Sequence, residues 1–157
     1  MSDTHPISSP TLANEHLIKL SSPSINAKAY QHTLGSLMYP MLATCLDLAY
    51  AVAALGHHTA NPGPDHQHAL ECVFQYLWAT TDYQLVLGCS TSSSPTLLSY
   101  ADADWASDIN DHKSTSGYVF TLGGRAISWN SKKQSTVTLS STEAEYITGC
   151  HAAKEAI

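Results

Sequence analysis

The most constraining feature of the sequence is an alternating segment at 97–104 that ends in two carboxylates. Two interleaved sets of residues make up the pattern: Leu98, Tyr100, Asp102 and Asp104 alternate with Leu97, Ser99, Ala101 and Ala103. In a strand these sets lie on opposite faces. Asp is disfavoured in strands, so the carboxylates require a reason. They form either a turn that ends the strand or part of a divalent-cation site, since hard cations take oxygen ligands; spacing alone favours the turn.

Composition restricts the class of protein. The chain has 157 residues, 43% of them apolar, which is typical of a globular protein with one domain or two small ones. The formal net charge of -6 argues against binding nucleic acid by bulk electrostatics. No apolar run reaches membrane-spanning length, and residues 1–24 lack a signal-peptide pattern. Four widely spaced cysteines indicate reduced thiols, so we expect an intracellular chain, in the cytoplasm or nucleus.

The pattern predicts three segments. Residues 1–26 are rich in Ser and Pro and are expected to be a disordered leader. Residues 27–90 are expected to be helical: a first helix that Pro40 kinks or ends, a second that Asp47 caps, and a third from Pro64 to about Ala79. A short strand is expected at 83–87, and a polar linker follows at 88–95. His66 and His68, two apart on a helix, are interpreted as surface residues rather than a metal pair.

Residues 96–157 are expected to form a separate domain of mixed α+β structure. Strands at 118–122 and 126–130 flank Gly123-Gly124, which predicts a hairpin. The sequence Ser140-Ser141-Thr142-Glu143 is a capping box, so a helix begins there. We expect its apolar face to contain Tyr146, Ile147, Cys150, Ala153 and Ile157. A row of small residues that includes Gly149 and Ala152 is expected to bring Glu145 near the first strand.

Four sequence blocks resemble a known family, and this resemblance favours the cation-site interpretation of the carboxylates. They are Tyr-Ala-Asp-Ala-Asp-Trp at 100–105, Asp-His-Lys-Ser-Thr-Ser-Gly-Tyr-Val at 111–119, Ser-Trp-Asn-Ser-Lys-Lys-Gln at 128–134 and Leu-Ser-Ser-Thr-Glu-Ala-Glu-Tyr at 139–146. In this order and spacing the series resembles the ribonuclease H domain of copia-type retrotransposon Pol polyproteins. Upstream, the blocks at 30–39, 47–52 and 61–63 resemble the segment of those polyproteins that joins reverse transcriptase to ribonuclease H, which has no chemistry of its own.

The resemblance implies an incomplete ribonuclease H-like fold, a three-stranded antiparallel sheet with one helix. It assigns Asp102 and Glu145 as catalytic, metal-binding carboxylates, with Mg²⁺ or Mn²⁺ as cofactor and an RNA–DNA hybrid as substrate. Lys113, Ser114 and Thr115 could contact the nucleic-acid backbone or only shape the loop. Asp104 and Glu143 do not match the catalytic positions, and we interpret them as turn and capping residues.

The family also requires a third Asp on a further strand and a later fourth acid, which this sequence does not contain. Two-metal hydrolysis needs several carboxylates, so we expect weak metal binding and little or no cleavage by this chain alone. Three readings therefore stand: a catalytically incomplete ribonuclease H-like remnant of Pol, a nuclease whose missing acids come from another chain, and a non-catalytic module for binding nucleic acid or protein. The sequence does not fix the oligomeric state, and it predicts an open sheet edge that invites pairing.

Overall fold

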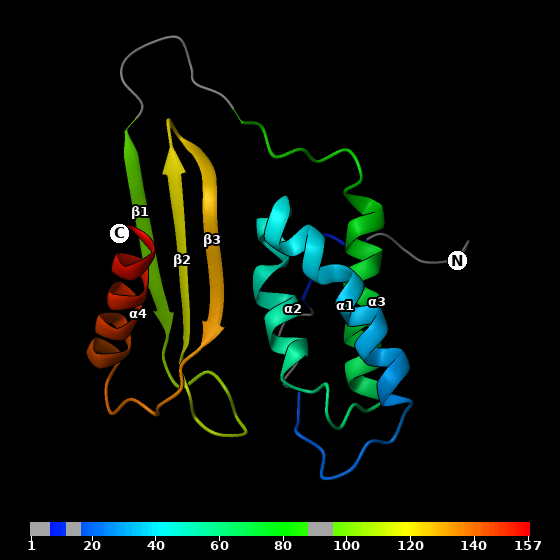
Figure 1. Cartoon of the computed structure of the whole chain (residues 1–157). Helices are drawn as coiled ribbons and strands as arrows, with labels where there is room; N and C mark the ends of the chain where they lie inside the picture. The colour runs from blue at the N-terminus through cyan, green and yellow to red at the C-terminus, as the bar shows by residue number, and fades with distance from the viewer. Residues whose placement is uncertain (1–6, 12–16, 88–95) are drawn as a thin grey trace. The chain divides into compact units, whose positions relative to one another are not determined.

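The computed structural model describes residues 7–11, 17–87 and 96–157 and separates the chain into two compact units, Met1–Gln84 and Leu85–Ile157 (Figure 1). The first unit is helical in its described part, and the second combines a sheet with a helix. The expected linker at 88–95 lies outside the described residues, so the predicted segment boundaries stay predictions. No helix in the described ranges is both long enough and apolar enough to cross a membrane.

The helical unit consists of α1 (Ala27–Ala43), a short 3-10 turn η1 (Leu46–Leu48), α2 (Ala49–Gly56) and α3 (Pro64–Ala79). Helix α3 has the bounds that the sequence predicts, because Pro64 occupies the first turn and Asp65 lies beside the amino-terminal end of the helix dipole. Side chains at helical spacing form one buried core: Tyr30, Leu34, Leu37, Leu48, Ala51, Val52, Leu55, Leu70, Val73 and Tyr76.

Three local predictions in this unit are corrected. Asp47 does not cap α2; it lies within η1 and accepts a hydrogen bond from the Tyr76 hydroxyl. Of the two effects predicted for Pro40, ending α1 is excluded because the helix continues to Ala43, whereas a kink stays a prediction. Residues 83–87 form no strand.

His66 is buried rather than at the surface. Its ring is 2% exposed and stacks on that of His58, with 4.1 Å between the ring centroids. The Gly63 N–H donates to His66 Nδ1 over 2.8 Å, which completes the amino-terminal cap of α3. Segment 17–26 contacts the same region, because the Ser24 N–H donates to the Pro62 carbonyl and Asn61 Nδ2 to the Leu20 carbonyl. These residues belong to the leader that we expected to be disordered.

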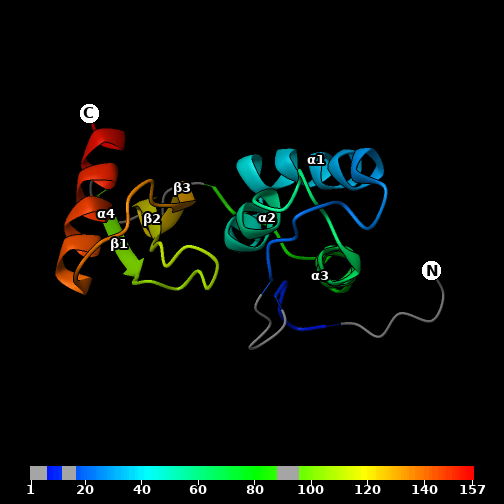
Figure 2. The ribbon, with the colours of Figure 1, turned by 90° about the horizontal axis from the view of Figure 1, so that it is seen from below.

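The second unit is a three-stranded antiparallel sheet with one helix, as the sequence predicts. The strands β1 (Leu97–Asp104), β2 (Thr115–Leu122) and β3 (Arg125–Lys133) follow in the order β1-β2-β3, and α4 (Ser141–Glu155) packs on β1 and β2 (Figure 2). This arrangement is consistent with part of a ribonuclease H-like fold. The strands β2 and β3 are longer than predicted and meet at Gly123 and Gly124, whose φ values of 59° and 80° suit a tight hairpin.

The face of α4 that packs on the sheet differs from the expected apolar face. Its buried residues are Ala144, Thr148 and Ala152, whereas Tyr146 is 75% exposed and Ile157 is fully exposed. A helix face predicted from hydrophobicity alone omits Thr148, because its side chain is polar. Thr148 is nevertheless buried, since its hydroxyl donates to the Ala144 carbonyl and also pairs with Ser116. Glu145 and Gly149, expected on the sheet-facing row, are both exposed.

Candidate functional site

Asp102 and Asp104 lie in the second half of β1. Asp102 is paired with Gly117 of β2, and Asp104 is paired with Thr115. Because residues alternate along a strand, the two carboxylates share a face with Tyr100 and alternate with Ala103. Both Asp residues are exposed. The strand therefore holds Asp102 within its regular ladder, while Asp104 is its final residue.

Glu143 and Glu145 lie in the first turns of α4. The Glu143 N–H donates to Ser140 Oγ over 3.2 Å, and Glu143 Oε2 accepts from the Leu139 N–H over 2.8 Å. Glu143 is thus a capping residue, as predicted. Glu145 is exposed. The hydrogen bonds described for this part of α4 do not involve its carboxylate.

A buried polar cluster fixes α4 against the sheet. Gln134 Nε2 donates to Ser116 Oγ over 2.9 Å and to the Ala144 carbonyl over 3.0 Å. Ser116 Oγ lies 2.7 Å from Thr148 Oγ1, and Ser116 is paired with Ala103 in the sheet. Asp102 precedes Ala103, and Glu145 follows Ala144. Because residues alternate along β1, Asp102 lies on the face of the sheet opposite the one on which Ser116 contacts Thr148, whereas Glu145 lies on α4 itself.

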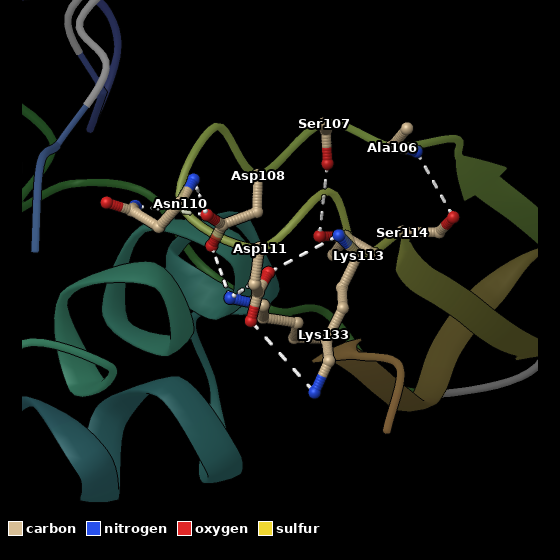
Figure 3. A network of polar contacts seen from close by, with 9 residues as sticks. Ala106, Ser107, Asp108, Asn110, Asp111, Lys113, Ser114 and Lys133 are labelled. Carbon is tan, nitrogen blue, oxygen red and sulfur yellow. Dashed lines mark hydrogen bonds and ion pairs between the residues drawn. The ribbon is translucent and has the colours of Figure 1, made fainter. Parts of the chain in front are cut away.

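A second network lies in the loop between β1 and β2 (Figure 3). Lys133 Nζ pairs with Asp108 and lies 2.8 Å from Asp111 Oδ1, while Lys113 Nζ lies 4.0 Å from Asp111 Oδ2. Burial alone would raise the pKa of Asp108, but hydrogen bonds from Lys133 and Asn110 and the charge of Lys133 outweigh it and lower the pKa to about 2. Burial opposes the charge of Lys133 as well, yet the two carboxylates raise its pKa. The network binds the loop to the end of β3.

The three residues predicted to contact a nucleic-acid backbone have different surroundings. Ser114 is fully buried; its hydroxyl accepts from the Ala106 N–H over 3.2 Å and lies 3.0 Å from Thr138 Oγ1. Thr115 Oγ1 lies 3.4 Å from Ser107 Oγ. Both hydroxyls therefore shape the loop, which is the alternative to a nucleic-acid contact that we gave for them. Lys113 is partly exposed, so its contact with phosphate stays a prediction.

The donor set does not amount to a complete metal centre. Carboxylates are the right ligands for Mg²⁺ or Mn²⁺, but nowhere in the described ranges do three or more His, Cys, Asp or Glu side chains form a group that could hold a metal ion. A two-metal site needs more negative charge than Asp102 and Glu145 provide. Gln134 and its partners in the polar cluster were not predicted, because a single Gln after a strand does not indicate which residues it will contact.

Comparison with known proteins decides the family. Over its whole length, in 164 aligned positions, the chain is 41% identical to a Retrovirus-related Pol polyprotein from transposon TNT 1-94 of Nicotiana tabacum. Over 88% of its length it is 44% identical to the Retrovirus-related Pol polyprotein from transposon RE2 of Arabidopsis thaliana. The chain belongs to the copia-type retrotransposon Pol family. It spans only 12% and 9% of those two Pol polyproteins. No family model matches the chain, and no solved structure does.

A relative of different description matches most of this chain. The Secreted RxLR effector protein 161 of Plasmopara viticola is 44% identical over 82% of this chain, and the match covers 89% of the effector. A segment similar to most of this chain therefore makes up most of another protein.

Proposed function

We propose that this chain is the part of Pol that begins a ribonuclease H domain, and that Asp102 and Glu145 are the carboxylates it contributes to cleavage of RNA in RNA–DNA hybrids. The observation that carries the proposal is the placement of these two acids. Asp102 lies in the ladder of the first strand, Glu145 lies on the helix that follows the three-stranded sheet, and one polar cluster holds both elements together.

We also propose that the 157-residue chain does not cleave by itself. Among the described residues no group of three or more His, Cys, Asp or Glu side chains could hold a metal ion. Hydrolysis by two cations requires one cation to activate water while the other stabilises the leaving oxygen. Lys133, which ends β3 and is less exposed than Lys113, is already paired with Asp108 and Asp111 of the loop. This leaves Lys113 as the loop's candidate for a phosphate contact.

Cleavage of a labelled RNA–DNA hybrid in Mg²⁺ or Mn²⁺ tests both parts. The purified chain should show no cleavage above that of Asp102→Asn. A chimera that joins this chain to the following Pol segment of the TNT 1-94 relative should cleave. Asp102→Asn and Glu145→Gln should abolish the activity of the chimera, whereas the matched changes Asp104→Asn and Glu143→Gln should preserve most of it.

Two results would overturn the proposal. Cleavage by the 157-residue chain that Asp102→Asn abolishes would mean that the chain holds a complete site. Equal loss of chimera activity from Asp104→Asn and Asp102→Asn would mean that the assignment to Asp102 is not specific.

A second candidate function is a non-catalytic assembly module. The effector relative favours it, because a segment of this extent accounts for most of a protein that is not described as a polymerase or nuclease. Under this proposal the Asp102→Asn variant keeps all partner binding, and neither the chain nor the chimera cleaves the hybrid.

A further inference from the structure

Residues 17–26, here called the strap, are bound to the turn that joins α2 to α3 in the helical unit. The Ser24 N–H donates to the Pro62 carbonyl over 3.1 Å. Nearer the start of the strap, Asn61 Nδ2 donates to the Leu20 carbonyl over 3.0 Å. Both hydrogen bonds end on consecutive residues of the turn, so the strap is held only while the turn keeps this conformation.

Gly63 links the strap to a buried histidine. A Cβ atom built on Gly63 would lie 2.5 Å from Leu20 Cδ1 and 3.4 Å from His66 Nδ1, so the strap and the imidazole both pack on this glycine. The Gly63 N–H donates to His66 Nδ1 over 2.8 Å. Such a bond needs a lone pair on Nδ1, which the neutral imidazole provides and the imidazolium does not. The turn that holds the strap is therefore built around an uncharged His66.

The surroundings of His66 oppose a positive charge on its ring. Its stacked neighbour His58 is only 8% exposed, so a proton added to either ring would be taken out of water. Two protonated rings would place like charges 4.1 Å apart between their centroids. His66 also lies in the first turn of α3, at the positive end of the helix dipole. Protonation therefore acts against the folded arrangement in three ways.

The other titratable side chains of the described elements around this pair are exposed. They belong to the strap, to α1, to the end of α2 and to α3, and they are Lys19, Lys28, His32, His57, Asp65, His68 and Glu71. Asp65 is next to His66 in sequence and favours a positive charge there, but water screens the attraction of an exposed carboxylate. The buried stacking and the hydrogen bond from Gly63 therefore dominate the response to pH.

We propose that protonation of the buried histidine pair releases the strap, so that the helical unit contains a switch that acts in mildly acidic conditions. With a proton on Nδ1, His66 directs a donor at the Gly63 N–H, and the two donors must separate. This separation moves the turn and with it the Pro62 carbonyl that holds the strap. Leu17 and Ile25, which pack on the helical core, then lose their cover. The switch lies in the helical unit and does not depend on the carboxylates of the sheet unit.

Amide NMR spectra of the full chain between pH ~8 and ~5 test the proposal. The Gly63 amide proton reports the bond to His66, the Ser24 amide reports the strap, and the Tyr30 amide, bonded to the Asn26 carbonyl, reports the integrity of α1. We expect the Gly63 and Ser24 signals to shift with the same midpoint as the ring protons of His66. Hydrogen exchange at Ser24, corrected for its intrinsic pH dependence, should become ~10-fold faster relative to Tyr30.

One variant and a matched control identify the titrating group. His66→Asn offers an amide oxygen to the Gly63 N–H but carries no titratable group, so it should keep the strap bound across the whole pH range. His68→Asn makes the same change at an exposed position two residues along α3 and should leave the wild-type transition unchanged.

Three results would overturn the proposal. The first is a Gly63 amide signal that does not follow the titration of the His66 ring, and the second is exchange at Ser24 and Tyr30 that accelerates together, which would mean unfolding of the whole unit. Both are measured on the wild-type chain and so do not require that His66→Asn folds. The third is a pH transition of the strap that persists in His66→Asn.

Discussion

Replacement of Lys133 by Met should destabilise the sheet unit in a manner that depends on pH. The Lys133 side chain is 14% exposed and the Asp108 side chain 19%, so solvent screens their attraction only in part. Lys133, together with hydrogen bonds from Asn110, lowers the pKa of Asp108 from 3.8 to about 2. Each pKa unit is equivalent to about 1.4 kcal/mol, which gives an upper bound of about 2.5 kcal/mol. With partial screening we expect a loss of about 1.5–2 kcal/mol at neutral pH.

The sign of the pH dependence follows from the lowered pKa. A carboxyl that ionises more easily in the folded state stabilises the fold above its ordinary pKa, and that stabilisation disappears as pH falls toward the folded value of about 2. The free-energy difference between wild type and Lys133→Met should therefore be largest above pH ~4 and should shrink steadily below it.

Urea unfolding followed by tryptophan fluorescence measures this difference. Trp78 lies in the helical unit, so a Trp78→Phe background leaves Trp105 and Trp129 to report the sheet unit. Lys132→Met is the matched control, because Lys132 is exposed and surface changes usually cost less than ~0.5 kcal/mol. An effect of Lys133→Met no larger than that of Lys132→Met, or one that persists unchanged near pH 2, would refute the reasoning.

Three further predictions concern single positions. Gln134→Leu removes the donor that joins Ser116 to the Ala144 carbonyl and should destabilise the sheet unit by ~2–3 kcal/mol in urea unfolding; an unchanged midpoint would contradict the role of the cluster. His112→Gly relieves a residue with φ of 53° and should raise thermal stability by up to ~1 kcal/mol; a loss of stability would show that the imidazole has a structural contact. The hydrogen bond to Asp47 and then burial raise the pKa of Tyr76 to about 12, and burial raises the pKa of Tyr30 to about 12. The resulting stabilisation of the helical unit is complete below pH ~10 and is lost as pH rises through about 12. Phenolate absorbance of a Tyr76→Phe variant should show one fewer late-titrating tyrosine than that of wild type.

Local signals allowed much of the fold to be predicted. The Gly-Pro-Asp sequence at 63–65 and the Ser140 cap each mark a helix start through hydrogen bonds formed within a few residues. The pair Gly123-Gly124 marks the hairpin for the same reason. These elements were predicted correctly because the interactions that define them are short in sequence.

The failures arose where the partner is distant in sequence. Asp is a residue type that often caps helices, but the hydrogen-bond partner of Asp47 is Tyr76, 29 residues away. Residues 83–87 have the side chains of a strand, but no strand of the described ranges pairs with them. Thr148 is polar yet buried, since Ser116 and Gln134 meet it from other elements. The strand pattern singled out Asp102, but the catalytic assignment of Asp102 and Glu145 came from the resemblance, and the sequence around them did not reveal the polar cluster between α4 and the sheet.

The most direct test of the central claim is the location of a bound divalent cation in the 157-residue chain. Paramagnetic broadening of backbone amide signals by Mn²⁺ would be mapped for wild type, Asp102→Asn and the matched Asp104→Asn. We expect weak broadening around Asp102 and Glu145 that Asp102→Asn removes and Asp104→Asn retains. Broadening centred on Asp108 and Asp111 in the loop, unchanged by Asp102→Asn, would contradict the claim that β1 and α4 supply the carboxylates of the site.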